Sequence, residues 1–490
     1  MEKWVKVDIR NDASLFPIFL FESGCGKNSS MQKALGASYK GLMYPFKGDA
    51  WGFYEIEGDT QRVAEILGKK VASDPDFVEH AIKETYRLGK RMLELTGEIS
   101  SITLASKSNA QLWTYYSDYC KRCKEMRGYA WIAPALDLSS ALSDKLRGII
   151  RRHLPDATED QLSILFTTLT NPKKFTLGKQ QDMDLLEIAA LIKSPKFIHS
   201  PQIQKLLIAH TKKYGWLPCT YENDPWKKEH FESVLESMLK QKTDAKKELE
   251  KIKNKEKEDE IKRKSTISLL ELSKSEIKLF DIASDLIFFK ADRKDILFRS
   301  YFEMRSLIAE IAKRLHLTPK QVRFMLPNEI KEALKNRPTN PSLYNERFKF
   351  SVAISKDDST EVYVGKEAQR IMREDVLEEK IIESKELRGQ CACPGFAKGT
   401  VKLILSPKDM HKMNQGDILV APATNPDIVP AMKKAAAIIT NTGGLTCHAA
   451  IVSRELGIPC IVGTKIATDV LKDGMMVELN ATKGIVGIIK

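Results

Sequence analysis

The sequence predicts a multidomain protein with a mainly α-helical N-terminal and central region and a C-terminal α/β domain. Three observations lead to this fold class. The chain has 490 residues, enough for several domains. From about residue 60 to residue 345, apolar residues recur at helical spacing. After Gly389, short apolar runs alternate with short helical segments, as in a compact α/β arrangement.

Residues 1–100 form the first predicted domain, a mixed α/β region. Strand character, either alternating or wholly apolar, is found over 4–9, 16–21 and 51–56. The run Gly24-Cys25-Gly26-Lys27 resembles the end of a phosphate-binding loop. However, the first glycine of that motif is missing, and Asn28 stands where Ser or Thr belongs. We therefore interpret this run as an ordinary loop.

Residues 101–345 form a predicted helical domain. It contains a long charged helix over 227–264, where Lys and Glu are interleaved and apolar residues are too sparse for a coiled coil. Cys120 and Cys123 form a single CxxC pair within a helical segment. Without a second pair at zinc spacing, packed thiols explain them better than a metal does. We predict no metal site.

Residues 346–388 are predicted to form a β-hairpin followed by a connector. The segment 348–355 alternates as a strand, and 361–364 returns as a second strand after a polar turn. The charged segment 374–387 lacks Gly and Pro, and we interpret it as the connector to the last domain.

Residues 389–490 form the last predicted domain, a β/β/α arrangement. Up to the end of the chain, short apolar runs that are candidate strands are separated by short helical segments. Cys391 and Cys393 fall at strand positions, so packing explains these thiols better than metal binding does.

Composition excludes several protein classes. The net charge is +13, but Lys and Glu are interleaved and no nucleic-acid-binding motif is present, so we do not expect nucleic-acid binding. No signal peptide or bilayer-spanning run is found, so we expect a cytoplasmic protein that does not bind membranes. The eight cysteines are scattered, which is typical of reduced thiols rather than a disulfide framework.

One stretch carries candidate chemistry. A short apolar segment, 437–440, is followed by Gly443-Gly444, a turn that can take positive φ, and then by a helical pattern from His448 to Leu456. His448 is therefore expected at the start of a helix, where unpaired N–H groups and the helix dipole favour an anion. An imidazole there can attack phosphorus and leave the phosphate against those donors.

The whole stretch 440–459 reads TNTGGLTCHAAIVSRELGIP. It resembles the phosphohistidine loop of the phosphoenolpyruvate-utilising enzymes, the family of phosphoenolpyruvate synthase and pyruvate phosphate dikinase, whose pattern is roughly TxxGGxxSHAAIxARELGIP. Two positions depart from the pattern: Cys447 replaces a frequent Ser, and Ser453 replaces a frequent Ala. The resemblance implies that His448 is the phosphorylated nucleophile and that the domain beginning at Gly389 is a swivelling phosphohistidine domain.

The resemblance also implies supporting roles for Gly443, Gly444, Thr446 and Arg454. Thr446 matches a position that is regulatory in some dikinases. Arg454 lies six residues beyond His448, nearly two helical turns, and so cannot share the helix-end position. Its guanidinium either reaches a phosphate brought by a partner domain or pairs with a carboxylate.

Larger members of the family contain an ATP-grasp domain and, in many cases, a TIM barrel; the resemblance suggests a helical linker and phosphohistidine domain without either. The chain would then be a phosphotransferase component of phosphoenolpyruvate synthase or dikinase type. It would carry phosphate on His448 between a separately encoded ATP-grasp (nucleotide-binding) partner and a small-molecule acceptor. ATP and Mg²⁺ are implied through that partner, and no cofactor is expected on this chain alone. The alternative is a non-catalytic regulatory or binding protein that retains the fold, and phosphate incorporation at His448 distinguishes the two.

Overall fold

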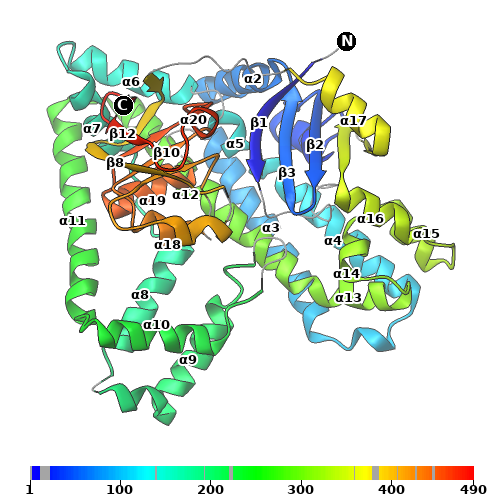
Figure 1. Cartoon of the computed structure of the whole chain (residues 1–490). Helices are drawn as coiled ribbons and strands as arrows, with labels where there is room; N and C mark the ends of the chain where they lie inside the picture. Colours follow the sequence, from blue (N-terminus) through cyan, green and yellow to red (C-terminus); the bar gives the residue numbers. More distant parts are fainter. Residues whose placement is uncertain are drawn as a thin grey trace. The chain divides into compact units, whose positions relative to one another are not determined.

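The structure, a computed structural model, divides into two compact units. One is formed by Met1–Thr167 with Glu303–Lys490, and the other by Thr168–Phe302. As predicted, the N-terminal and central parts are largely helical and the C-terminal part is α/β (Figure 1). The predicted strand over 16–21 lies outside the described residues. These are 3–10, 22–74, 76–137, 141–192, 194–219, 224–357, 359–377, 386–405, 407–424, 428–443 and 447–489.

An antiparallel sheet of five strands, in the order β1-β3-β2-β4-β5, combines distant parts of the chain. The sequence analysis placed the hairpin in a segment of its own; in the structure its first strand pairs with β2, with Ala353 opposite Tyr44. Trp4, Met43, Val352 and Ile371 share one buried cluster, so apolar burial joins the hairpin to the N-terminal strands. The strands are β1 (Trp4–Arg10), β2 (Gly41–Lys47), β3 (Ala50–Ile56), β4 (Ser351–Lys356) and β5 (Ser359–Val364).

Outside the second unit, the other elements that precede the C-terminal domain are helices, and the ends of these helices follow local capping signals. Ser108, for example, begins α4 with a capping box: its hydroxyl accepts from the Gln111 amide, and the Gln111 side chain accepts from the Ser108 amide. The helices are α1 (Ser30–Leu35), α2 (Asp59–Ser73), α3 (Phe77–Ser101), η2 (Leu104–Ser106), α4 (Asn109–Ala130), α5 (Ile132–Asp137), α6 (Ala141–His153), α7 (Glu159–Thr170), α13 (Arg305–Arg314), α14 (Pro319–Arg323), α15 (Pro327–Leu334), α16 (Pro341–Lys349) and α17 (Gly365–Glu374).

The second unit is helical, and it corrects the prediction of one continuous charged helix over 227–264. Two helices occupy that segment, because Lys242 takes a positive φ of 53° and Asp244 then caps a new helix by accepting from the Lys247 amide. The Asp244 cap was a signal present in the sequence. The helices here are α8 (Leu177–Ala189), η3 (Pro195–His199), α9 (Pro201–Tyr214), α10 (Lys228–Lys240), α11 (Ala245–Leu269) and α12 (Lys274–Glu303).

The C-terminal domain is built on a sheet of eight strands in the order β6-β13-β12-β8-β9-β10-β11-β7. Neighbouring strands from β8 to β11 run parallel, and the remaining pairs run antiparallel. Orange and red mark this domain in Figure 1. Its elements are β6 (Glu386–Arg388), β7 (Gln390–Cys393), β8 (Phe396–Leu403), η4 (Pro407–Lys412), β9 (Ile418–Ala421), α18 (Val429–Met432), β10 (Ala437–Thr440), α19 (His448–Leu456), β11 (Cys460–Val462), α20 (Ala467–Val470), β12 (Met476–Asn480) and β13 (Ile485–Ile489).

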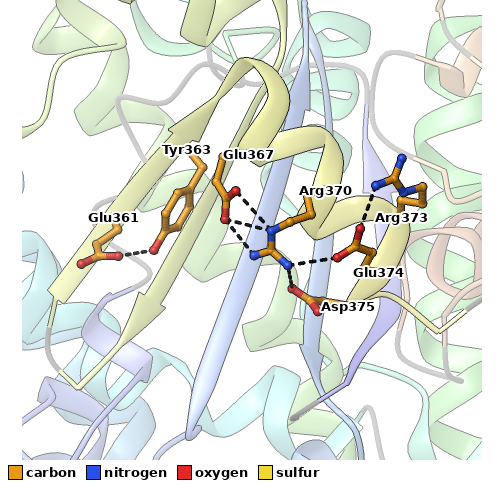
Figure 2. A network of polar contacts seen from close by, with 7 residues as sticks. All are labelled: Glu361, Tyr363, Glu367, Arg370, Arg373, Glu374 and Asp375. Carbon is orange, nitrogen blue, oxygen red and sulfur yellow. Dashed lines mark hydrogen bonds and ion pairs between the residues drawn. The ribbon is translucent and has the colours of Figure 1, made fainter.

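The charged end of α17 lies where the predicted connector begins. Figure 2 shows Arg370 between three carboxylates, those of Glu367 at 2.7 Å, Glu374 at 3.4 Å and Asp375 at 3.6 Å, with Arg373 also on Glu374 at 2.7 Å. Exposed pairs of this kind contribute little one by one, but together they hold the last turn of the helix.

Both ends of the predicted connector, 374–387, belong to folded elements. On one side, the Trp4 amide donates to the Asp375 carbonyl and the Leu377 amide donates to the Trp4 carbonyl, both at 2.9 Å. On the other side, β6 begins at Glu386, and its Leu387 pairs with Val486 of β13. The rest of the connector, 378–385, lies outside the described residues. No helix in the described part of the chain is long and apolar enough to cross a membrane.

Candidate phosphohistidine site

The candidate site lies at one edge of the C-terminal sheet. Strands β9, β10 and β11 are parallel, with Ile438 of the central strand opposite both Leu419 and Cys460. The loops that follow these strands therefore emerge at the same end of the sheet. In open α/β sheets, ligands bind at the end of the sheet where the carboxyl ends of the strands lie.

Backbone and side-chain bonds hold the turn after β10 in place. The Thr464 hydroxyl and amide both donate to the Thr440 carbonyl, at 2.9 and 3.1 Å. The Thr442 hydroxyl and amide both donate to the Pro422 carbonyl, at 3.0 Å each. The turn is thus tied to the ends of both neighbouring strands before the chain reaches the histidine.

Gly443 continues the turn in a conformation that favours glycine. Its φ is +114°, and a Cβ added there would lie 2.7 Å from Cys447 Sγ. Both observations exclude a side chain at this position, and the positive φ agrees with the prediction for this glycine. Gly444 and Thr446, the other predicted loop residues, lie outside the described residues.

Helix α19 begins at His448, as the sequence predicts. Cys447 is the N-cap, and its sulfur accepts from the Ala450 amide at 3.4 Å. The helix ends at Gly457, which takes the left-handed conformation with φ 68° and so closes the last turn. His448 is thus the first helical residue, directly behind the glycine turn and half-buried.

The His448 ring has a partner that sequence reasoning missed. Thr424 Oγ1 lies 2.7 Å from His448 Nδ1, and Thr424 is buried. This threonine follows β9, whereas the histidine follows β10, so the parallel register of the two strands brings them together. A polar residue just past a buried strand was the available signal, because neighbouring parallel strands end at a shared edge.

Arg454 does not share the helix end with His448. Six residues of α-helix separate them by about 9 Å, and Arg454 Nε donates to the Ala392 carbonyl of β7 at 2.8 Å. Burial lowers the pKa of Arg454 below its ordinary value. The side chain ties the helix to the edge strand of the sheet.

Among the described residues, no group of three or more His, Cys, Asp or Glu side chains is arranged to hold a metal ion. The geometry instead presents an imidazole with one nitrogen hydrogen-bonded, at a helix start, beside a glycine turn. This arrangement suits nucleophilic attack on an electrophile whose product carries negative charge.

Residues 413–484 match the family model of the PEP-utilising enzyme, mobile domain. The match includes His448, Thr424 and Gly443. It also includes all three parallel strands whose carboxyl ends form the site.

Similar curated proteins are phosphoenolpyruvate synthases. A probable phosphoenolpyruvate synthase of Archaeoglobus fulgidus is 59% identical over 113 residues, which are 22% of this chain and 15% of the relative. The phosphoenolpyruvate synthase of Pyrococcus furiosus is 49% identical over 144 residues, 28% of this chain and 18% of the relative. That of Pseudomonas aeruginosa is 43% identical over 117 residues, 23% of this chain and 15% of the relative. The chain thus spans less than a fifth of the length of each of these relatives.

The family-model match lies within the C-terminal domain, which resembles the mobile domain of phosphoenolpyruvate-utilising enzymes. Among solved structures, aconitase X of Thermococcus kodakaraensis covers 22% of the chain at 22% identity, with a TM-score of 0.18, too low to support a shared fold.

Proposed function

We propose that this protein carries a phosphoryl group on His448 as a component of a phosphoenolpyruvate synthase or dikinase type reaction. The observation that carries the proposal is the hydrogen bond between Thr424 Oγ1 and His448 Nδ1 at the start of α19. In this reading a separate nucleotide-binding partner, with ATP and Mg²⁺, supplies the phosphoryl group. A small molecule finally accepts it.

The hydrogen bond selects the attacking atom. With its proton on Nδ1 and that nitrogen hydrogen-bonded to Thr424 Oγ1, the neutral imidazole carries its lone pair on Nε2, which is then the nitrogen that attacks phosphorus. A bond forms between Nε2 and phosphorus, and the bond from phosphorus to the leaving oxygen breaks, with the electron pair departing on that oxygen. Attack through Nε2 follows because Nδ1 is engaged on the protein side of the ring.

A hydroxyl suits this role because it both donates and accepts hydrogen bonds. Before attack, Thr424 accepts the Nδ1 proton in a hydrogen bond. If Nδ1 loses that proton after the phosphoryl group has bonded, the same hydroxyl rotates and donates to the bare nitrogen. One residue therefore holds the ring in both states without moving the backbone.

The helix start stabilises the product. The first amide groups of a helix have no intrahelical acceptor, and the helix dipole places partial positive charge there. A phosphoryl group on the first residue of α19 adds negative charge at that position. The interaction is stronger in the phosphorylated than in the free state, so it favours transfer onto the histidine.

Transfer between two partners requires the domain to change neighbours. The C-terminal domain would swing about the segment between two fixed points. These are Leu377, whose amide is hydrogen-bonded to the Trp4 carbonyl, and Glu386, where β6 begins. We propose that the C-terminal domain, residues 389–490, moves as a rigid body and that the donor site lies on another polypeptide. Small-angle scattering of the full chain should then require more than one arrangement. Deleting residues 380–383 should narrow the distribution and slow phosphotransfer while the domain stays folded.

The decisive test is phosphate incorporation at His448. The full chain, incubated with partners co-purified from its host, is analysed by intact mass under alkaline conditions, because phosphohistidine is acid-labile. His448→Ala should abolish incorporation, while His411→Ala, an exposed histidine of the same domain, should leave it unchanged. Label that persists in His448→Ala would contradict the proposal. A wild-type chain that never accepts phosphate would favour a binding or regulatory protein.

A further inference from the structure

Four cysteines gather beneath the start of α19, although they are scattered along the sequence. Strand pairing places Cys460 of β11 opposite Cys393 of β7, and the next pair joins Ile461 to Cys391. Helix α19 packs on both strands, and Cys460 Sγ lies 4.0 Å from the carbonyl oxygen of Ala449, the residue after the candidate nucleophile. The fourth cysteine is Cys447, which caps the helix.

Arg454 lies among these four thiols. Its guanidinium interacts electrostatically with all four sulfurs. Cys447 Sγ accepts from the Ala450 amide at 3.4 Å, and Cys460 Sγ lies 4.0 Å from the carbonyl of the preceding residue, Ala449. The two sulfurs therefore lie against consecutive residues in the first turn of α19. A neighbouring cation favours the ionised form of sulfur, which is its reactive form.

The thiols differ in access to solvent. Of the eight cysteines, all of which lie in the described part of the chain, Cys447 alone is not buried. It also stands at a helix N-terminus, which favours negative charge on sulfur just as the guanidinium does. Burial raises the pKa of the Cys460 thiol, so this sulfur is unreactive until an oxidised partner is placed beside it.

We propose that Cys447 and Cys460 form a reversible disulfide that switches off the site when the protein meets a peroxide. The Cys447 thiolate attacks one oxygen of hydrogen peroxide or an alkyl hydroperoxide. The O–O bond breaks, and the sulfur becomes a sulfenic acid as water or an alcohol leaves. Cys460 sulfur then attacks the sulfenic sulfur, and water leaves with the sulfenic oxygen. Two thiols are oxidised by two electrons in total, and one peroxide is reduced.

The bond would disturb the site because Cys447 directly precedes His448. In the reduced protein Cys447 Sγ caps the Ala450 amide and packs on Gly443. Drawn toward Cys460, it leaves both positions and pulls the first helical residue away from Thr424. Phosphate uptake should then fall in proportion to the oxidised fraction. This consequence rests on the proposed function, whereas formation of the disulfide does not.

Trypsin separates the cysteines cleanly, so the disulfide can be mapped directly. Cleavage after Lys and Arg yields 435–454 with Cys447, 455–465 with Cys460, and 389–398 with both remaining cysteines of the cluster. The full reduced chain is titrated with hydrogen peroxide, quenched with N-ethylmaleimide and digested without reductant. We expect 435–454 linked to 455–465, with the link lost after dithiothreitol.

Variants complete the test. Cys447→Ser and Cys460→Ala should each remove the link, whereas Cys120→Ser, a change outside the cluster, should form it as the wild type does. Circular dichroism establishes that each variant is folded. A link between 389–398 and 455–465 with Cys447 still alkylated would overturn the proposal, as would oxidation of Cys447 without any link. The mapping needs no phosphate donor, so its failure is distinct from a failure of the phosphotransfer proposal.

Discussion

Two histidines, one in the C-terminal domain and one in the second unit, show how surroundings decide what an imidazole does. His448 is the first residue of its helix, is half-buried, and has a hydroxyl on Nδ1. His210 lies within α9, is 5% exposed, and contacts the rings of Tyr214 at 4.8 Å and Phe231 at 4.7 Å. The first ring is held at a helix end where charge is welcome, and the second is packed as part of a core.

The pKa of His210 also reflects its packing in a core. Burial lowers the pKa of His210 to about 4, so its ring is neutral at physiological pH, and its Nε2 lies 3.4 Å from the Gln181 amide nitrogen. The neutral state here serves packing. Under the proposed function, the His448 ring instead attacks phosphorus. The comparison teaches that position in the helix and the partner on the ring, not the residue type, distinguish a candidate nucleophile from a core residue.

The largest expected effect comes from the glycine turn that sets His448 apart. Gly443→Ala places a methyl group against Cys447 Sγ and strains a positive φ, so we expect phosphate incorporation to slow by roughly 10–100-fold. Gly457→Ala is the matched control, because Gly457 also takes a positive φ, of 68°, at the other end of α19 but has open space around it. It should lower stability by about 1 kcal/mol and leave the rate nearly unchanged. Equal rates in the two variants would mean that the turn does not position the nucleophile.

The threonine on the His448 ring comes next. Thr424→Val keeps the shape and removes the hydroxyl, so we expect a loss of about 10-fold in the single-turnover rate and a shift in its pH profile. Thr424→Ser retains the hydroxyl and should recover most of the rate. If the valine and serine variants had equal rates, the hydrogen bond would not contribute to phosphate transfer. The partner on the ring would then not distinguish His448 from His210.

For His210 the expected effect is on stability. Its folded-state pKa of about 4 lies below the ordinary value of 6.5, so the unfolded state binds more protons between these two values. The stabilisation from the neutral ring is complete above pH 6.5 and is lost as pH falls toward 4, by up to roughly 3 kcal/mol. Denaturant unfolding of wild type and His210→Phe across this range measures the difference. A difference that did not change with pH would show that the ring is not held neutral.

The smallest expected effect concerns Arg454. Arg454→Lys keeps a positive charge but cannot reproduce the guanidinium bond to the Ala392 carbonyl. We expect a loss of stability of about 1 kcal/mol, visible as a lower Tm, with the rate of phosphate incorporation within about threefold of the wild type. A much slower rate at unchanged stability would instead assign this side chain to the phosphate.

The site illustrates which features a sequence can predict. The turn at Gly443, the start of α19 at His448 and its end at Gly457 all followed from one continuous stretch. Glycine conformation and helix ends depend on residues within a few positions of one another, so they can be read locally. The candidate nucleophile was predicted from the same stretch, through its resemblance to the phosphohistidine loop.

Other features could not be read in this way. The residue on the His448 ring, Thr424, lies 24 positions away and reaches it only because β9 and β10 are parallel neighbours. The thiol cluster likewise depends on the pairing of β11 with β7, since no sequence spacing places Cys460 opposite Cys393. The five-stranded sheet joins the N-terminal strands to a hairpin some three hundred residues later in the chain.

The sequence by itself therefore determined the candidate nucleophile, its glycine turn and its helix. Only the tertiary structure decided what holds that histidine and what lies beneath it. Local features depend on short-range sterics and capping, which act between near neighbours in the chain. Strand order and register depend instead on which distant apolar surfaces are buried together, and no local pattern specifies that choice.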